Sequence, residues 1–224
     1  MKKTRLFFLL TVVLGCFAAI GLMNIPSMNR IKSGDIRSME DVEDGNYQSG
    51  DLVKGTIECC VGCCAEEYKT NWGIRTSKSS DKLYYVILLN NDKYMVLCTS
   101  DKDEYRRLDT LYDETIEYFE QLVDEEVDYE SITPPVSTMS FEGQAVSIPS
   151  DIVGYFKEWY DEYAAYEGSV FESECEMLML RSSEFDGINT MVYVGIGCGA
   201  AAVLCLILAI VFVIKSKRDE VYGY

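Results

Sequence analysis

Four cysteines lie close together in the stretch ECCVGCCAEEY, residues 58–68. The spacing Cys60-x-x-Cys63 is that of half a zinc site or of a thioredoxin-type dithiol. A structural zinc site needs four ligands, which usually come as two pairs from separated segments. We therefore treat six thiols as candidate zinc ligands, four in the cysteine cluster and two further along the chain: Cys59, Cys60, Cys63 and Cys64, then Cys98 and Cys175.

Two other chemistries fit the same thiols. A redox dithiol should open a helix, whose N-terminus lowers the thiol pKa, whereas the glutamates around the cysteine cluster would raise it. Disulfides are the third option, because six thiols are an even number. A cluster sulfur could pair with Cys98 or Cys175, but adjacent cysteines bond each other only with strain. The sequence leaves structural thiols or disulfides, a metal site and redox chemistry open.

The chain contains no histidine. It therefore lacks the commonest general base and the commonest metal ligand. A Ser-His-Asp or Cys-His hydrolase is excluded for this chain acting alone. Acidic pairs are so numerous that none stands out as a pair of catalytic carboxylates, and we expect no catalytic residue set.

Two apolar runs enclose these residues. Leu6–Ile25 has 20 residues and Met191–Ile214 has 24, and neither contains a charged side chain. About 20 apolar residues span a bilayer as a helix. Basic residues precede the first run and follow the second, so the positive-inside rule predicts cytoplasmic termini and an extracellular central domain. Two alternatives for the first run are a cleaved signal peptide and a lipoprotein signal ending at Cys16.

This arrangement predicts a two-pass cell-membrane protein with seven segments. They are a cytoplasmic N-terminus (1–5), a transmembrane helix (6–25), a linker (26–50), an extracytoplasmic α+β domain (51–180), a juxtamembrane segment (181–190), a second transmembrane helix (191–214) and a cytoplasmic tail (215–224). Neither apolar run contains an ionisable residue of the kind that marks an ion pathway, so we expect none.

The central domain alternates between strand and helix patterns. Period-two alternation predicts strands at 52–60 and 170–180, and apolar runs rich in aromatic and branched residues predict strands at 83–89 and 94–99 with a turn at 90–93 between them. A weaker strand is expected at 66–74, and 139–148 is either a strand or a hairpin with a turn at Glu142-Gly143. Apolar positions at helical spacing predict helices that begin near Ser100 and Ser150. The order favours an α+β fold, an antiparallel β-meander or small barrel with two amphipathic helices. The Tyr/Trp-rich face of the second helix is either a packing face or a binding platform.

The central segment is strongly acidic. Residues 26–190 carry 35 acidic and 14 basic side chains, a net charge of −21. This charge disfavours nucleic acid and anionic polymers as partners and favours a basic partner or bound cations. The same charge can also serve only to keep a surface domain soluble.

The second apolar run carries a small-residue pattern. Gly195-x-x-x-Gly199 lets two helices approach closely, and Gly15 and Ala19 offer a similar surface on the first run. We expect either pairing of the two runs or a homo-oligomer formed through the Gly195/Gly199 face.

Several stretches together resemble a known group of proteins. These are GDLVKGTI (Gly50–Ile57), CAEEY (Cys64–Tyr68), a YYVILL strand, an acidic amphipathic helix, a Tyr/Trp-rich helix and the two terminal apolar runs. Over most of the chain they resemble an uncharacterised family of two-span proteins from Gram-positive, often gut-dwelling, bacteria. The resemblance implies no activity. It implies a single cysteine, Cys64, before the AEEY stretch, so the other three cluster cysteines are a departure.

We therefore expect a non-enzymatic, membrane-anchored binding or accessory module of the cell envelope. The expected partners are the lipid bilayer and a basic or envelope protein, with no nucleic acid. The alternative is a thiol- or metal-dependent function, zinc or redox, that centres on Cys60 and Cys63.

Overall fold

A computed structural model describes residues 2–222 except 72–73, 76, 78–79 and 124–131. Part of the strand predicted at 66–74, and the outermost residues of both predicted cytoplasmic ends, therefore lie outside the described residues. The chain forms two compact units, residues 35–183 and residues 1–34 with 184–224. Each unit is described by itself.

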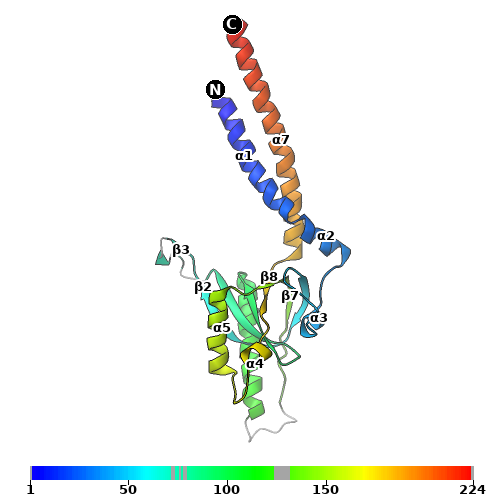
Figure 1. Ribbon diagram of the computed structural model, residues 1–224, viewed down its shortest axis with the longest axis vertical. Coiled ribbons are helices and arrows are strands. Elements are labelled where there is room, and N and C mark those ends of the chain that lie inside the picture. The colour runs from blue at the N-terminus through cyan, green and yellow to red at the C-terminus, as the bar shows by residue number, and fades with distance from the viewer. Residues whose placement is uncertain (1, 72–73, 76, 78–79, 124–131, 223–224) are drawn as a thin grey trace. The chain divides into compact units, whose positions relative to one another are not determined.

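The first unit is built on one sheet of six strands (Figure 1). The strands are β1 (Leu52–Ile57), β2 (Cys60–Glu67), β5 (Lys82–Leu88), β6 (Tyr94–Thr99), β7 (Met139–Ser147) and β8 (Leu178–Ser182). Their order is β1-β7-β8-β6-β5-β2, and only the β6–β8 pair is parallel. A separate two-stranded hairpin joins β3 (Thr70–Asn71) to β4 (Ile74–Arg75).

The mixed α+β class is confirmed, but the sheet is open and mixed, not an antiparallel meander. The consecutive strands β1 and β2 form its opposite edges. Only Glu58 and Cys59 separate these strands, so the Cα atoms of Ile57 and Cys60 lie at most about 11 Å apart. The sheet must therefore curve until its two edges approach each other, although no strand pairing joins β1 to β2 among the described residues.

One helix covers each face of the sheet. Leu108 and Leu111 of α4 (Lys102–Val123) share a buried cluster with residues of all six strands. This is the inner face of the curve, because side chains from both edges meet there. The outer face packs against Phe156 and Trp159 of α5 (Ser150–Tyr163). Two short helices, α3 (Met39–Glu43) and α6 (Phe171–Glu174), complete the unit.

Two predicted segments differ in part from the structure. Of the two alternatives for 139–148, the strand is confirmed and the hairpin is wrong, because β7 runs straight through Glu142-Gly143 and pairs with both β1 and β8. The strand predicted at 170–180 was wrong at its start, which is the α6 turn, and right at its end, where β8 begins. Phe171 and Cys175 are four residues apart, and that spacing puts two side chains on one side of a helical turn as well as of a strand.

The second unit consists of α1 (Lys2–Met23), α2 (Ile25–Ser33) and α7 (Phe185–Tyr222). Both α1 and α7 are long and apolar enough to cross a membrane. They lie side by side in Figure 1, and a Cβ built on Gly195 would lie 2.6 Å from the Gly21 Cα. The Gly195/Gly199 face of α7 thus packs against α1, and an association between copies through this face would first have to displace α1.

Candidate functional site

The cysteine cluster lies at the edge strand β2. Cys59 precedes the strand, and the three other cluster cysteines lie on it. Its pairing with β5 shifts register twice, and each shift adds one residue to β2, first Val61 and then Cys64. Cys60 is buried in the cluster beneath α4, whereas Cys64 packs against the α5 cluster. The bulged strand therefore sends neighbouring thiols to opposite faces of the sheet.

The two more distant candidate ligands are separated from the cysteine cluster by strands. Cys98 lies on β6, and β5 runs between β6 and β2. Two strand spacings amount to roughly 10 Å, whereas disulfide-bonded cysteines have Cα atoms less than about 7 Å apart. The backbone of Cys175 forms an isolated β-bridge with Tyr94 of β6. Strand β5 lies between β6 and β2, so Cys175 is also remote from the cysteine cluster. Among the described residues, no group of three or more Cys, Asp or Glu side chains is arranged to hold a metal ion.

The thiols of the cysteine cluster are held in the protonated form. Burial raises the pKa of Cys60 and of Cys64 to about 12, and it raises the pKa of Cys59 and Cys63 as well. The thiolate is the nucleophile and the metal ligand, so a raised pKa slows both kinds of chemistry at neutral pH. The environment of β2 thus disfavours thiolate chemistry, although Cys63 is exposed.

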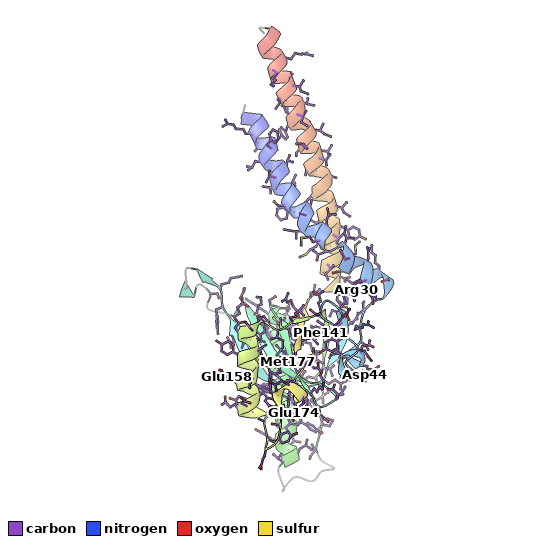
Figure 2. The ribbon with its side chains drawn as sticks, in the orientation of Figure 1. Arg30, Asp44, Phe141, Glu158, Glu174 and Met177 are labelled. Atoms are coloured by element: carbon purple, nitrogen blue, oxygen red, sulfur yellow. The ribbon has the colours of Figure 1, made fainter. Side chains whose placement is uncertain are left out.

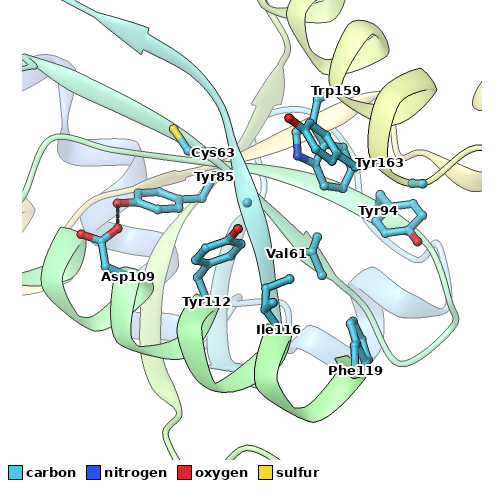
Figure 3. A pocket seen from close by; sticks show the side chains of 12 residues that line it. Val61, Cys63, Tyr85, Tyr94, Asp109, Tyr112, Ile116, Phe119, Trp159 and Tyr163 are labelled. Atoms are coloured by element: carbon cyan, nitrogen blue, oxygen red, sulfur yellow. Dashed lines mark hydrogen bonds between the residues drawn. The ribbon is translucent and has the colours of Figure 1, made fainter. Parts of the chain in front are cut away.

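A groove of about 530 Å³ crosses this edge of the sheet (Figure 3). Its floor is the bulged part of β2, and its walls come from α4, α5 and two further strands. Most of the lining side chains are aromatic or aliphatic, and Asp109 is the one carboxylate among them: Val61, Gly62, Cys63, Tyr85, Tyr94, Asp109, Tyr112, Ile116, Phe119, Trp159, Tyr163 and Ala164. We refer to this feature as the aromatic groove.

Helical spacing explains one wall of the aromatic groove. Tyr112, Ile116 and Phe119 are separated by four and three residues on α4, so they lie on one side of the helix. Asp109 begins the same stripe, and its Oδ1 accepts a 2.7 Å hydrogen bond from the buried Tyr85 hydroxyl (Figure 3). Burial and this bond hold the pKa of Tyr85 well above its usual value. The carboxylate is thereby fixed in one orientation at one end of the groove.

On the opposite wall, α5 places the Trp159 indole against Gly62 of the groove floor. Gly62 has a φ of 153°, and a Cβ built on it would lie 2.7 Å from the Trp159 Nε1. The Trp159 ring lies 5.6 Å from that of Tyr94 and 6.1 Å from that of Tyr163. The rings of Tyr94, Trp159 and Tyr163 therefore form one aromatic group (Figure 3), and the Trp159 indole is the member that adjoins the glycine.

Sequence reasoning found part of this site. Of the six candidate thiols, only Cys63 lines the aromatic groove. The Tyr/Trp-rich face of the second helix, which we considered as a binding platform, supplies Trp159 and Tyr163. Asp109 and Tyr85 were missed, because nothing in the sequence shows that β5 and α4 place them in contact. The apolar run of β5 and the apolar stripe of α4 predicted only that these elements pack in the core, not which residues they bring together.

The fold and the site define a class of protein: an α+β domain with an open aromatic groove, in a chain that also carries two apolar helices. The chain belongs to a family described as a domain of unknown function (DUF8577), whose model matches residues 1–215. No curated protein and no solved structure matches the chain.

Proposed function

We propose that this protein is a membrane-anchored binding module of a bacterial cell envelope and that its aromatic groove takes up a segment of a basic protein partner. The observation that carries the proposal is the aromatic groove itself, whose 530 Å³ lie in an acidic domain. Exposed aromatic walls bury well against a partner. The net charge of −21 over residues 26–190 attracts a cationic chain before contact.

Binding fits this groove better than catalysis does. Its one cysteine, Cys63, has a pKa raised by burial, and its one carboxylate, Asp109, has no second carboxylate opposite it in the lining. A polypeptide segment with apolar and basic side chains would match both the rings and the charge.

The membrane placement is part of the same proposal. Helices α1 and α7 would anchor the chain, and the basic residues at both ends would stay in the cytoplasm. The groove would then face the outside of the cell. In a chain whose native cysteines are replaced by serine, a membrane-impermeant maleimide should label a Glu158→Cys variant on intact cells but not a Lys217→Cys variant. Labelling of the second variant alone would reverse the orientation.

Fluorescence of the full chain in detergent micelles tests the binding function. A Trp72→Phe change leaves Trp159 as the reporter in the aromatic groove. We expect Gly-Ser peptides that carry basic residues to change its emission, with an affinity that falls as salt is added. Matched peptides that carry glutamate should have no effect.

Two tyrosines of α5 provide a matched pair of variants. Tyr163 lines the aromatic groove and is 69% exposed, whereas Tyr155 is 52% exposed and lies outside it. Tyr163→Ala should weaken binding of the basic peptides, and Tyr155→Ala should leave it unchanged. Equal effects of the two variants, or equal binding of the acidic peptide, would refute the function.

A further inference from the structure

We propose that the Asp109 end of the aromatic groove recognises the guanidinium of an arginine side chain on the partner. This inference rests on the proposed function and names the group that the groove selects. It depends on three features of the lining: a fixed carboxylate, an aromatic ring beside it, and a run of further rings across the floor.

The carboxylate comes first. Asp109 is exposed on α4, and the Tyr85 hydroxyl bonds its Oδ1 at 2.7 Å. The other oxygen, Oδ2, receives no hydrogen bond or ion pair from the part of the chain that the structure describes. Because the buried Tyr85 holds Oδ1, the orientation of the carboxylate is fixed where Asp109 lines the end of the groove (Figure 3). A planar donor with several N–H groups fits such an edge better than a point charge does.

An aromatic ring adjoins this carboxylate. Tyr112 is three residues after Asp109, so both side chains project from the same side of α4. Figure 3 shows the Tyr112 ring between Asp109 and the rings of α5. A guanidinium that pairs with Asp109 can therefore stack on Tyr112, and stacking of this kind is a property of guanidinium more than of ammonium.

The remaining groove accommodates the rest of the segment. Its 530 Å³ exceed what one side chain fills, and Val61 and Gly62 present a floor without a large side chain. The rings of Trp159, Tyr163 and Tyr94 lie beyond that floor and offer a second aromatic surface. An extended basic segment could therefore place an arginine at Asp109 and an apolar or second cationic residue at Trp159.

Peptides of equal length test the choice of cation. They carry arginine, lysine or the neutral arginine analogue citrulline at the same positions in a Gly-Ser background, and Trp159 emission of the full chain reports binding. The arginine peptide should bind roughly three- to tenfold more tightly than the lysine peptide, the range expected for a partly exposed stacked ion pair. The citrulline peptide should bind least.

Two charge-matched variants locate the effect. Asp109→Asn should abolish the preference for arginine over lysine. Glu158→Gln removes the same charge from an exposed position on α5 outside the groove (Figure 2) and should keep the preference. Equal affinities of the arginine and lysine peptides for the unmodified groove would overturn the arginine inference. So would equal losses of the preference in the two variants.

Failure of the two proposals is distinguishable. If arginine and lysine peptides bind equally while Tyr163→Ala still weakens both, the arginine inference is wrong and the binding function stands. If no basic peptide changes the Trp159 emission, both proposals are wrong.

Discussion

Gly62 is the residue on which the floor of the aromatic groove depends most directly. Its φ of 153° lies in a region that side-chain-bearing residues rarely adopt, and the Trp159 indole occupies the space that a Cβ would need. The glycine therefore allows the edge strand to bulge and the Nε1 side of the indole to approach its backbone closely. These two requirements together make its replacement costly.

A Gly62→Ala variant should lose about 2–4 kcal/mol of unfolding free energy, from backbone strain and overpacking combined. Urea unfolding of the full chain in micelles, followed by circular dichroism, measures the loss. Gly154→Ala is the matched control, because Gly154 lies in the middle of α5 with no atom within 4 Å of a built Cβ. That variant should gain about 0.5–1 kcal/mol. A Gly62→Ala variant as stable as the parent would contradict the geometry.

Cys60 gives a pH-dependent prediction. Burial raises the pKa of its thiol to about 12, whereas an unfolded cysteine titrates near 9. Below pH 9 both states carry the thiol. Above it only the unfolded chain ionises, so the free energy of unfolding should fall by up to about 1.4 kcal/mol per pH unit toward pH 12. Unfolding at pH 8, 9 and 10 should show little change from this thiol between pH 8 and 9 and a clear fall from pH 9 to 10, and Cys60→Ala should reduce that fall. An equal slope in both would show that Cys60 is not responsible.

The cysteine cluster shows what residue types and spacing can predict. The sequence predicted that nearby glutamates raise the pKa of these thiols. The pKa of all four is raised, but burial is the largest cause for each, and a glutamate contributes only at Cys59 and Cys63. Spacing alone did not show that two bulges divide the thiols between two faces. A bulge depends on the partner strand, here β5, and one sequence carries no direct signal of it.

At the scale of elements, the Thr115 hydroxyl of α4 adds a hydrogen bond to the packing of this helix against the edge strand β2. Thr115 is fully buried, its Oγ1 donates to the Leu111 carbonyl at 2.7 Å, and it accepts from the Cys60 N–H at 3.4 Å. The second bond joins the inner helix to the outermost strand, where no further strand is available to the Cys60 backbone among the described residues. It contributes to the position of the groove floor against its α4 wall.

A Thr115→Val variant keeps the shape of this side chain and removes the hydroxyl. The Cys60 N–H is then buried without its acceptor, so the unfolding free energy should fall by about 1–3 kcal/mol. Thr110→Val is the matched control on the same helix, because its exposed hydroxyl bonds only the Arg106 carbonyl. That change should stay within about 0.5 kcal/mol. Equal effects in urea unfolding would show that the bond to β2 contributes nothing.

Local sequence patterns predicted most helices and strands, but they could not predict which distant strands pair with each other. The β5–β6 hairpin follows from two apolar runs around Asn90–Lys93, and both long helices follow from their apolar stripes. For 139–148 the sequence left open a strand or a hairpin that turns at Gly143, and this glycine instead lets the strand β7 approach the Arg181 backbone of β8. The pairing of β1 with β7 joins segments more than 80 residues apart, and no local pattern encodes which distant strand is the partner.

At the scale of the whole molecule, the two apolar helices are built to pack on each other. Gly21 and Gly195 meet backbone to backbone, Ala18 lies against Gly199, and the rings of Phe7 and Phe212 stack at 5.6 Å. In a bilayer no hydrophobic effect drives such a pair, so close approach of small residues supplies the attraction. The sequence predicted the glycine surface but left open whether it serves one chain or two.

A Gly195→Leu variant should separate α1 from α7, because its side chain would occupy the place of the Gly21 backbone. Cysteines in place of Phe7 and Phe212, in a chain whose native cysteines are all serine, report the pairing through a short bismaleimide. Crosslinking within one chain should fall several-fold. Gly197→Leu is the control, because no atom lies within 4 Å of a Cβ built there. Unchanged crosslinking in Gly195→Leu would mean that the glycine contact does not hold the pair. A shift to crosslinks between chains would mean that the freed face of α7 finds a second copy.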